Sequence, residues 1–406
     1  MKKVGNSTGI SCARCGACLA TCPVYQVTLH ERFSPRARWE LISYALSADA
    51  VPVRRREALL ETLRACLQCG ACSDICPAGA DVCQAVRNAR SGLIFEQGLP
   101  LWFKGALNTS LRAPGLTRLI QSLPRGAGLV RRFAAFFAKK SPYKRIPNPA
   151  RIPVVMDRGL RGLCASDSRH AKIVLFTGCL QNYVYKDVVK GMINWFGEGS
   201  VYIPEDQVCC GLSAYSSGEK ELASHLARKN LDILSMEEGQ VIVTGCASCA
   251  SMIRTWPKLF KKDDPVWEKA CQVAENVKEF TEYVVEGRLI PHRPSFRAFS
   301  KVVLHVPCHQ RFSIGASRSP WFLLKGIYQD SVSLLELCCG QGGSFALECP
   351  EISEKIFQRA HSSLLDTDSA VKAVFTTCSG CLLQWDLLLP EGSNRPVVLH
   401  PAQALL

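Results

Sequence analysis

The sequence predicts an α+β protein, in which a mainly helical N-terminal domain is followed by a duplicated α/β module with parallel sheets. Strand-like and helix-like segments alternate through residues 170–406, an order typical of parallel sheets with covered faces. The alternation occurs twice, with nearly the same spacing of its cysteines. Residues 1–90 instead carry two cysteine motifs joined by helical sequence. A chain of 406 residues is long enough for two or three domains with separate cores.

The duplicated module is defined by two matched sets of five cysteines, spaced C-x29-CC-x35-C-x2-C and C-x29-CC-x38-C-x2-C. In the first copy we expect strands at 172–176, 201–203 and 241–244 and a helix at 219–234. In the second copy we expect strands at 302–306, 332–335 and 371–376 and a helix at 351–365. Every cysteine group follows a strand, and open α/β sheets build their sites at the carboxyl ends of strands. The thiols of each copy are therefore expected to gather there.

Two motifs of the N-terminal region have the spacing of bacterial ferredoxins. Cys12-x2-Cys15-x2-Cys18-x3-Cys22-Pro23 recurs as Cys66-x2-Cys69-x2-Cys72-x3-Cys76-Pro77. In such a run three close thiolates hold three corners of one 4Fe–4S cubane, and the fourth cysteine binds the other cluster. On this rule the ligands of cluster 1 are Cys12, Cys15, Cys18 and Cys76, and those of cluster 2 are Cys66, Cys69, Cys72 and Cys22. Structural zinc is the alternative, but it prefers two separated cysteine pairs.

The five-cysteine sets differ from these runs, because a cubane has only four ligand positions. Adjacent cysteines such as Cys209 and Cys210 point in divergent directions, so both do not easily bind neighbouring corners of a cubane. Either one thiol of each set is spare, or the cluster is non-cubane and open enough to take more ligands. Zinc or a disulfide is the other interpretation, because adjacent thiols and CxxC pairs also occur in zinc and redox proteins.

The net charge of +14 is concentrated in residues 101–160, which hold twelve Lys or Arg residues against one acid, Asp157. A solvated face explains such a run as readily as a binding surface does. Apolar and aromatic residues beside the charge, at 101–104 and 129–137, would suit an anionic membrane surface or an acidic partner subunit. No nucleic-acid-binding motif accompanies the charge, so we expect no nucleic acid partner.

The chain divides into a ferredoxin-type domain at 1–90, a basic helical connector at 91–168, a first module at 169–290 and a second module at 291–406. A helix is expected at 36–48, where Ser34 and Pro35 form a typical helix start. The N-terminus shows no signal peptide, and no apolar run approaches the roughly 20 residues that cross a bilayer. Clustered cysteines then indicate metal ligands in a reducing cytoplasm. We expect a cytoplasmic protein that meets a membrane only peripherally, at the inner face of the cell membrane.

With these motifs the chain resembles the family that contains the glycolate oxidase iron–sulfur subunit, the D subunit of heterodisulfide reductase and the C subunit of anaerobic glycerol-3-phosphate dehydrogenase. The resemblance covers nearly the whole chain, and CGACLATCPVY at 15–25, SPRAR at 34–38 and CCGQGGSF at 338–345 look most like the glycolate oxidase branch. In heterodisulfide reductases such modules bind non-cubane 4Fe–4S clusters that cleave a disulfide. The resemblance implies two ligand sets, Cys179, Cys209, Cys210, Cys246 and Cys249 in the first module and Cys308, Cys338, Cys339, Cys378 and Cys381 in the second.

The sequence shows no dinucleotide fingerprint, P-loop, Ser/His/Asp set or paired carboxylates, and thus no visible group that takes a hydride. Clusters pass single electrons, whereas oxidation of a 2-hydroxy acid delivers two, so a flavin on a partner subunit must bridge the two processes. Our first hypothesis is an oxidoreductase subunit that relays electrons from an FAD-containing subunit, which oxidises glycolate or D-lactate, to a quinone or another acceptor. We expect two cubane clusters and one or two further iron–sulfur clusters, cubane or non-cubane.

Two alternatives follow from the same resemblance. In one, the module clusters are catalytic and reduce a thiol disulfide; in the other, the chain anchors glycerol-3-phosphate dehydrogenase to the membrane. His305 and His309 flank Cys308 and are either hydrogen-bond donors to cluster sulfur or ordinary core histidines. The four remaining cysteines receive no role, because free cysteine is usually a small buried apolar residue. They are Cys83, Cys164, Cys271 and Cys349.

Overall fold

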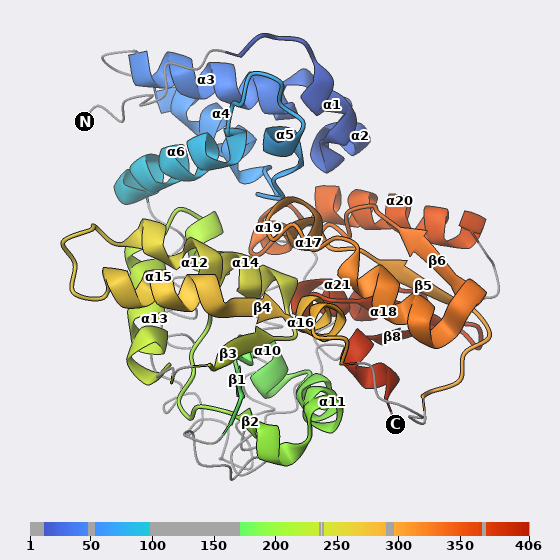
Figure 1. Ribbon diagram of the computed structural model, residues 1–406. Coiled ribbons are helices and arrows are strands. Elements are labelled where there is room, and N and C mark those ends of the chain that lie inside the picture. Colours follow the sequence, from blue (N-terminus) through green and yellow to red (C-terminus); the bar gives the residue numbers. More distant parts are fainter. Residues whose placement is uncertain are drawn as a thin grey trace, which may run out of the picture.

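The computed structural model describes residues 12–47, 53–97, 171–234, 237, 239–289, 296–367 and 371–405. A helical N-terminal domain lies above two α/β modules that lie side by side (Figure 1). Each module contains a four-stranded parallel sheet. The predicted α+β class, with its duplicated module, is therefore confirmed. The basic connector expected at 91–168 lies outside the described residues, apart from residues 91–97.

The N-terminal domain combines short helices at the cysteine motifs with longer helices that cover them. The short helices are α1 (Ala17–Thr21), α2 (Pro23–Thr28), the 3-10 helix η1 (Glu31–Phe33) and α5 (Ala71–Asp74). The longer helices are α3 (Pro35–Ser47), α4 (Val53–Arg64) and α6 (Val82–Gln97). Ser34 caps α3, since its Oγ accepts a hydrogen bond of 3.1 Å from the backbone N–H of Ala37. The helix expected at 36–48 is therefore present.

The first module carries a sheet of order β2-β1-β3-β4 in which all neighbours are parallel. Its strands are β1 (Ile173–Leu175), β2 (Val201–Tyr202), β3 (Val241–Thr244) and β4 (Val277–Glu279). Its helices are α10 (Gly178–Tyr183), α11 (Lys186–Phe196), α12 (Leu212–Ser216), α13 (Lys220–Ile233), α14 (Ala247–Thr255), α15 (Trp267–Asn276) and α16 (Phe280–Glu286), with 3-10 turns η3 (Glu198–Ser200) and η4 (Trp256–Leu259). Parallel strands need crossover connections, and these helices supply them.

The second module repeats this plan with a parallel sheet of order β6-β5-β7-β8. Its strands are β5 (Val302–His305), β6 (Val332–Leu335), β7 (Ala373–Thr376) and β8 (Val397–Leu399). Its helices are α17 (Cys308–Phe312), α18 (Ser319–Tyr328), α19 (Phe345–Glu348), α20 (Pro350–Thr367) and α21 (Ser379–Leu388), with 3-10 turns η5 (Gln329–Ser331) and η6 (Pro401–Ala404).

The edge strands β4 and β8 are not among the strands expected from the sequence. Each is only three residues long, and β4 reads Val-Lys-Glu rather than as a run of apolar residues. β4 therefore lacks the continuous apolar pattern typical of a strand buried in a parallel sheet, and β8, which reads Val-Val-Leu, is apolar but shorter than the four to eight residues expected of a strand. The other six strands lie within two residues of their expected bounds, with the largest shift at the start of β7.

The two modules pack against each other through α11 and η6. The Trp195 indole N–H donates a hydrogen bond of 3.1 Å to the backbone carbonyl of Ala402. Gly191 lies beneath the same carbonyl, and a Cβ at this position would collide with it. Glycine is therefore required where the C-terminal turn of one module crosses a helix of the other.

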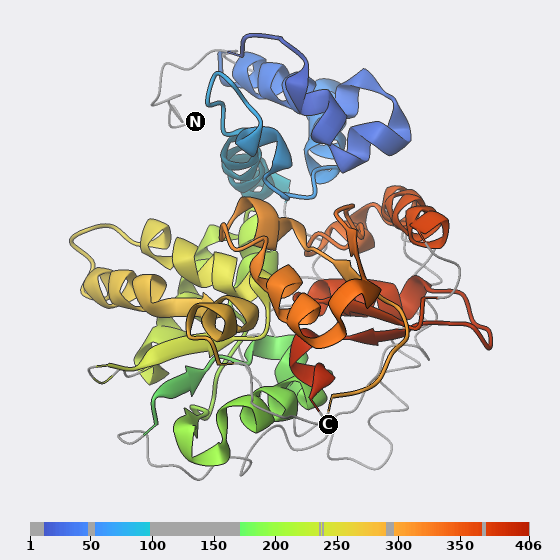
Figure 2. The same ribbon diagram turned by 45° about the vertical axis from the view of Figure 1, so that its right-hand side comes forward.

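The N-terminal domain contacts both modules beside the second cysteine motif. Leu67 reaches Gly342 of the second module so closely that a Cβ on Gly342 would collide with the Leu67 side chain. Arg90 of α6 donates a hydrogen bond to the backbone carbonyl of Ser216 in the first module. Figure 2 shows this domain above the junction of the modules after a 45° turn.

No described helix combines the length and the apolar character needed to cross a bilayer.

Candidate metal centres

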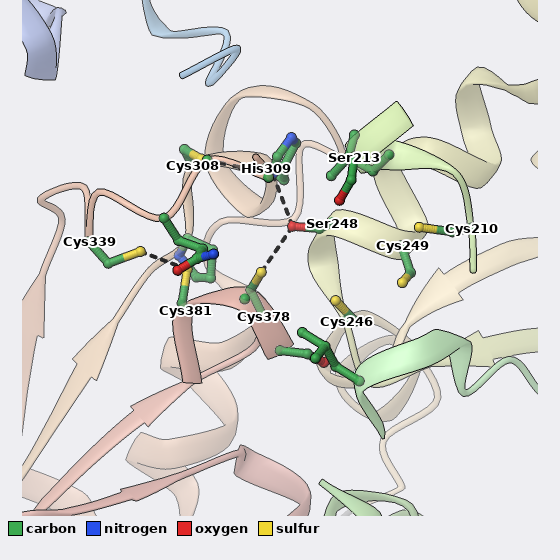
Figure 3. Close-up of a pocket in the computed structure, with 18 of the residues that line it drawn as sticks. Cys210, Ser213, Cys246, Ser248, Cys249, Cys308, His309, Cys339, Cys378 and Cys381 are labelled. Atoms are coloured by element: carbon green, nitrogen blue, oxygen red, sulfur yellow. Dashed lines mark hydrogen bonds between the residues drawn. The ribbon is translucent and has the colours of Figure 1, made fainter. Parts of the chain in front are cut away.

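The cysteine-bearing ends of the two sheets open into one cavity of about 140 Å³. Figure 3 shows thiols from both modules around this space. The cavity is lined by all ten module cysteines, namely Cys179, Cys209, Cys210, Cys246, Cys249, Cys308, Cys338, Cys339, Cys378 and Cys381. The structure thus brings together not only the members of each five-cysteine set but also the two sets, which the sequence does not predict.

The position of each thiol follows from the ends of secondary structure elements. Cys246 and Cys378 are the N-cap residues of α14 and α21, just after β3 and β7. Gly211 and Gly340 follow the two Cys-Cys pairs with φ angles of 93° and 85°, a backbone region that residues with a Cβ rarely adopt. A Cβ on Gly340 would also lie 2.5 Å from the Ser353 carbonyl oxygen. The glycine of each Cys-Cys-Gly motif is thus required by the backbone that places the thiols.

The thiols lie close enough to interact with one another. The Sγ atoms of Cys179 and Cys209 are 3.8 Å apart, and those of Cys339 and Cys381 are 3.3 Å apart. Cys246 and Cys378, from different modules, share a hydrogen bond between their thiols. Hydrogen bonds from Cys246 and Cys381 hold the pKa of the Cys378 thiol well below its usual value, despite burial. The two sets therefore adjoin at their CxxC pairs.

Ser248 and His309 are polar residues of the cavity that belong to neither five-cysteine set. The Ser248 hydroxyl lies 2.9 Å from Cys378 Sγ and 3.1 Å from His309 Nδ1, so it connects the first module to two residues of the second (Figure 3). Burial lowers the pKa of His309 to about 4, which keeps the ring neutral at neutral pH. These side chains form a hydrogen-bond bridge inside the sulfur cavity.

The ring of His305 is held in place by protein oxygens, although it lies near two thiols. Its donor atoms and those of Cys339 and Cys381 fall within 4.8 Å of one another, a spacing that a single metal ion could use. However, its Nδ1 lies 3.0 Å from Thr376 Oγ1 and its Nε2 lies 3.0 Å from the carbonyl of Leu337. Both ring nitrogens are therefore occupied, and His305 fixes the backbone just before the second Cys-Cys pair.

The expected ligands of cluster 2 gather in a separate, buried cavity of the N-terminal domain. Its walls include the four predicted ligands together with Cys83 and Arg38; the predicted ligands are Cys22, Cys66, Cys69 and Cys72. All four are buried. Arg38 points its Nη1 at Cys22 Sγ, at 4.0 Å. The sequence alone assigns no role to Cys83 or Arg38, because neither belongs to a ferredoxin cysteine motif.

The expected ligands of cluster 1 lie nearer the surface, where α1 packs against α5. Cys15 is exposed, and Cys12, Cys18 and Cys76 are half-buried. Backbone N–H groups donate to two of these sulfurs, from Arg14 to Cys12 Sγ at 3.4 Å and from Ala80 to Cys76 Sγ at 3.3 Å. Hydrogen bonds to ligand sulfur are one of the means by which a protein sets the potential of a cluster.

Leu67 separates the cluster 2 cavity from the ten-cysteine cavity, since its side chain lines both. A third cavity, of about 390 Å³, lies between the N-terminal domain and the second module and is lined by Cys69, Cys308 and Cys338. Thiols of the N-terminal domain and of the second module therefore line the same cavity.

The donor atoms at all of these places are predominantly thiols. Soft thiolate ligands select iron–sulfur clusters, zinc or Cu(I). The grouping of four buried thiols around one cavity fits a cubane, and the two five-thiol sets exceed the four ligands of a tetrahedral zinc site. The residues present thus fit iron–sulfur clusters, which when bound supply one-electron transfer.

Comparisons with known proteins agree with this chemistry. A family model described as a 4Fe-4S dicluster domain matches residues 9–80, and one described as a cysteine-rich domain matches 173–254 and 302–386. The probable glycolate oxidase iron-sulfur subunit of Bacillus subtilis is 25% identical over 435 residues, which cover 98% of this chain and 93% of that protein. Lactate utilization protein A 2 of Bacillus mycoides is 30% identical over 247 residues, 58% of this chain and 98% of that protein. An uncharacterized iron-sulfur protein of Methanocaldococcus jannaschii is 26% identical, and the match covers 91% of this chain and 66% of that protein.

Proposed function

This chain belongs to the iron–sulfur protein family that includes the glycolate oxidase iron-sulfur subunit and lactate utilization protein A, and on that basis we propose that it serves a flavin-linked 2-hydroxy acid dehydrogenase. It is the iron–sulfur component of an oxidoreductase. A partner subunit with bound FAD would oxidise glycolate or D-lactate. This chain would carry the electrons to a quinone or another acceptor.

The observation that best supports a relay is the series of sulfur sites through the molecule. It begins at the exposed Cys15, continues in the buried cavity of cluster 2, and crosses Leu67 to the ten-cysteine cavity. Sites in series suit a subunit that passes electrons between partners, because an electron then travels only the short distance from one site to the next. We assign the ligands as expected from the sequence. Both ferredoxin sets lie in the domain at 1–90, one five-cysteine set lies in the module at 169–290 and the other in the module at 291–406, while the connector at 91–168 holds none.

The complex isolated through a tag on this chain tests the proposal. It is purified without oxygen and mixed in turn with glycolate, D-lactate and glycerol 3-phosphate, and reduced clusters are detected by low-temperature electron paramagnetic resonance (EPR). Reduction by a 2-hydroxy acid that disappears when FAD is stripped from the complex would support the proposal. Clusters that dithionite reduces but no 2-hydroxy acid reduces would contradict it. Reduction by glycerol 3-phosphate alone would favour a subunit of that dehydrogenase.

Disulfide reduction is the second candidate function, and the shared cavity favours it. Both five-cysteine sets open into one space, which also contains the side chains of Ser248 and His309. A small disulfide could thus meet both sets at once. The same preparation, reduced with a viologen dye, is offered a disulfide of a thiol cofactor. Consumption of the disulfide by a preparation whose clusters no 2-hydroxy acid reduces would establish this function in place of the first.

Attachment to the inner face of the cell membrane is proposed from the basic stretch at 101–160, which lies outside the described residues. Its Lys and Arg residues would meet anionic lipid headgroups, each contributing about 1 kcal/mol near the surface. Deletion of residues 101–140 should move the chain from the membrane fraction to the supernatant. An unchanged distribution between the fractions would count against the proposal.

A further inference from the structure

The cavity of cluster 2 contains one thiol more than a cubane uses. Cys83, the second residue of α6, lines it beside the four predicted ligands. Its side chain is buried, with 5% of its surface exposed. It packs in the same buried cluster as Cys66 and Cys72 and lines the same cavity. A fifth sulfur is therefore fixed against two of the expected ligands.

The role of this fifth sulfur depends on which of the neighbouring thiols carry a proton when the cluster is bound. Iron takes cysteine as thiolate, so cluster binding removes the protons of Cys66 and Cys72. Cys83, which is not needed as a ligand, has the S–H group of a free thiol, which is a weak hydrogen-bond donor. It can therefore donate to a neighbouring ligand sulfur, which as a thiolate has no proton of its own to donate.

Arg38 places a positive charge in the same cavity. The residue is 2% exposed, and its Nη1 lies 4.0 Å from Cys22 Sγ. The guanidinium is held in place by backbone carbonyls, with Nε donating to Thr62 at 3.2 Å and Nη2 donating to Ala65. A buried charge of this kind requires an opposite charge nearby, and ligand thiolates supply it.

The arginines near cluster 1 have a different environment. Arg14 forms an ion pair with Glu40 and Arg36 forms one with Glu31, and in both pairs the carboxylate is about half exposed or more. Solvent and the neighbouring carboxylates screen these charges from the cluster 1 site. Arg38 therefore distinguishes the buried site from the exposed one.

We propose that Cys83 and Arg38 raise the reduction potential of the cluster bound by Cys22, Cys66, Cys69 and Cys72. Reduction adds one negative charge, which burial disfavours and which a thiol donor and a guanidinium both stabilise. One electron leaves the exposed site and arrives at the buried one, with no bond made or broken. The inference deepens the proposed relay and depends on it for the direction of electron flow, whereas the potential itself does not depend on the substrate.

Redox titration of the anaerobic full-length protein, followed by EPR, tests the proposal without hydroxy acid or flavoprotein. Failure of the hydroxy acid reaction therefore leaves this result untouched. Cys83→Ala should keep its iron content but lower the equilibrium constant for reduction of one cubane about tenfold, equal to about 59 mV for one electron. Cys83→Ser, which retains a hydroxyl donor, should fall between the wild type and Cys83→Ala. Cys15→Ser identifies the signal of the exposed site, and Cys271→Ala, in the half-buried part of α15, is the matched control.

Exchange into deuterated water provides a readout that a purely structural role would not affect. The wild type should show an exchangeable proton coupled to the buried cluster, and Cys83→Ala should lack it. Arg38→Met should lower the same midpoint potential if the variant folds. If it does not fold, the two Cys83 variants alone test the proposal. Loss of about four iron atoms in Cys83→Ala would make Cys83 a ligand and overturn the proposal. An unchanged midpoint potential in both Cys83 variants would overturn it equally.

Discussion

Glu279 and His400 occupy corresponding places in the two modules and face each other at the boundary between them. Glu279 ends β4 and is the N-cap residue of α16, and His400 follows β8 and is the N-cap residue of η6. Each forms a capping box with the helix that it caps. His400 Nε2 lies 3.9 Å from Glu279 Oε1, and both side chains are fully buried. The duplicated plan thus brings an acid and an imidazole together away from water.

Replacement of Glu279 by Gln should remove a loss of stability at high pH. Burial raises the pKa of Glu279 to about 8, although Thr281 and Gln310 donate hydrogen bonds to it. Between the usual value of 4.5 and about 8 the folded chain holds one proton more than the unfolded chain, so the free energy of unfolding falls as pH rises. We expect this decline in the wild type and not in Glu279→Gln, measured by anaerobic urea unfolding.

His400 has the opposite pH dependence, which sets the range for that comparison. Burial lowers its pKa to about 3, from a usual value of 6.5. Below pH 6.5 the unfolded chain binds this proton and the folded chain does not, so stability is lost as pH falls. Between about pH 6.5 and 8 the dependence due to His400 fades, and both proteins share it, so the difference between their curves reports the proton of Glu279. Parallel curves for the wild type and Glu279→Gln over this range would contradict the assignment.

Gly342→Ala should weaken the contact between the N-terminal domain and the second module. The residue has a φ of 52°, and a Cβ would collide with Leu67. Gly79→Ala is the matched control, because Gly79 has a φ of 68° but no atom within 4 Å of the point where a Cβ would lie. Both variants should lose about 1 kcal/mol from backbone strain. Gly342→Ala should lose a further 1–3 kcal/mol or so from overpacking, measured by thermal unfolding; equal losses would show that Leu67 moves away freely.

Arg90→Met should destabilise the loop before Cys66 and its contact with the first module. The Arg90 guanidinium donates to the carbonyls of Leu63 and Cys66, with Nη2 2.8 Å from the Cys66 oxygen, and also to Ser216. Loss of a buried donor that serves several carbonyls should cost about 2–4 kcal/mol in chemical unfolding. The exposed Arg14 should tolerate the same substitution. A variant of Arg90 as stable as that of Arg14 would show that water replaces the guanidinium.

The parts of the site that sequence predicts are those set by spacing along the chain. Cys66, Cys69 and Cys72 are three residues apart, so a single short loop brings their thiols into one cavity. Strands such as β3 and β5 are visible because each is a four-residue segment that begins with three apolar residues in a row. Local geometry is sufficient in these cases, and no distant contact has to be known.

The parts that sequence does not predict depend on packing between distant segments. The two five-cysteine sets share a cavity because the Ala247 N–H donates to the Thr377 carbonyl at 2.8 Å and Tyr185 bonds Asp386 at 3.0 Å, across the module boundary. From sequence alone, an arginine such as Arg38 is expected on the exposed face of a helix, because arginine is rarely buried. Its burial becomes visible only when the carbonyls of α4 and the loop after it are in place.

Cys246→Ala and Cys378→Ala should each affect both modules, because the two thiols share a hydrogen bond across the boundary. Each variant should lose about four iron atoms from its own site. The EPR signal of the remaining module site should also shift, since that site loses the neighbouring ligand charge of the missing one. Cys271→Ala should retain the iron content and the signals of the wild type. Iron analysis alongside EPR measures both effects, and an unshifted signal from the remaining site would show that the two sets act independently once iron is bound.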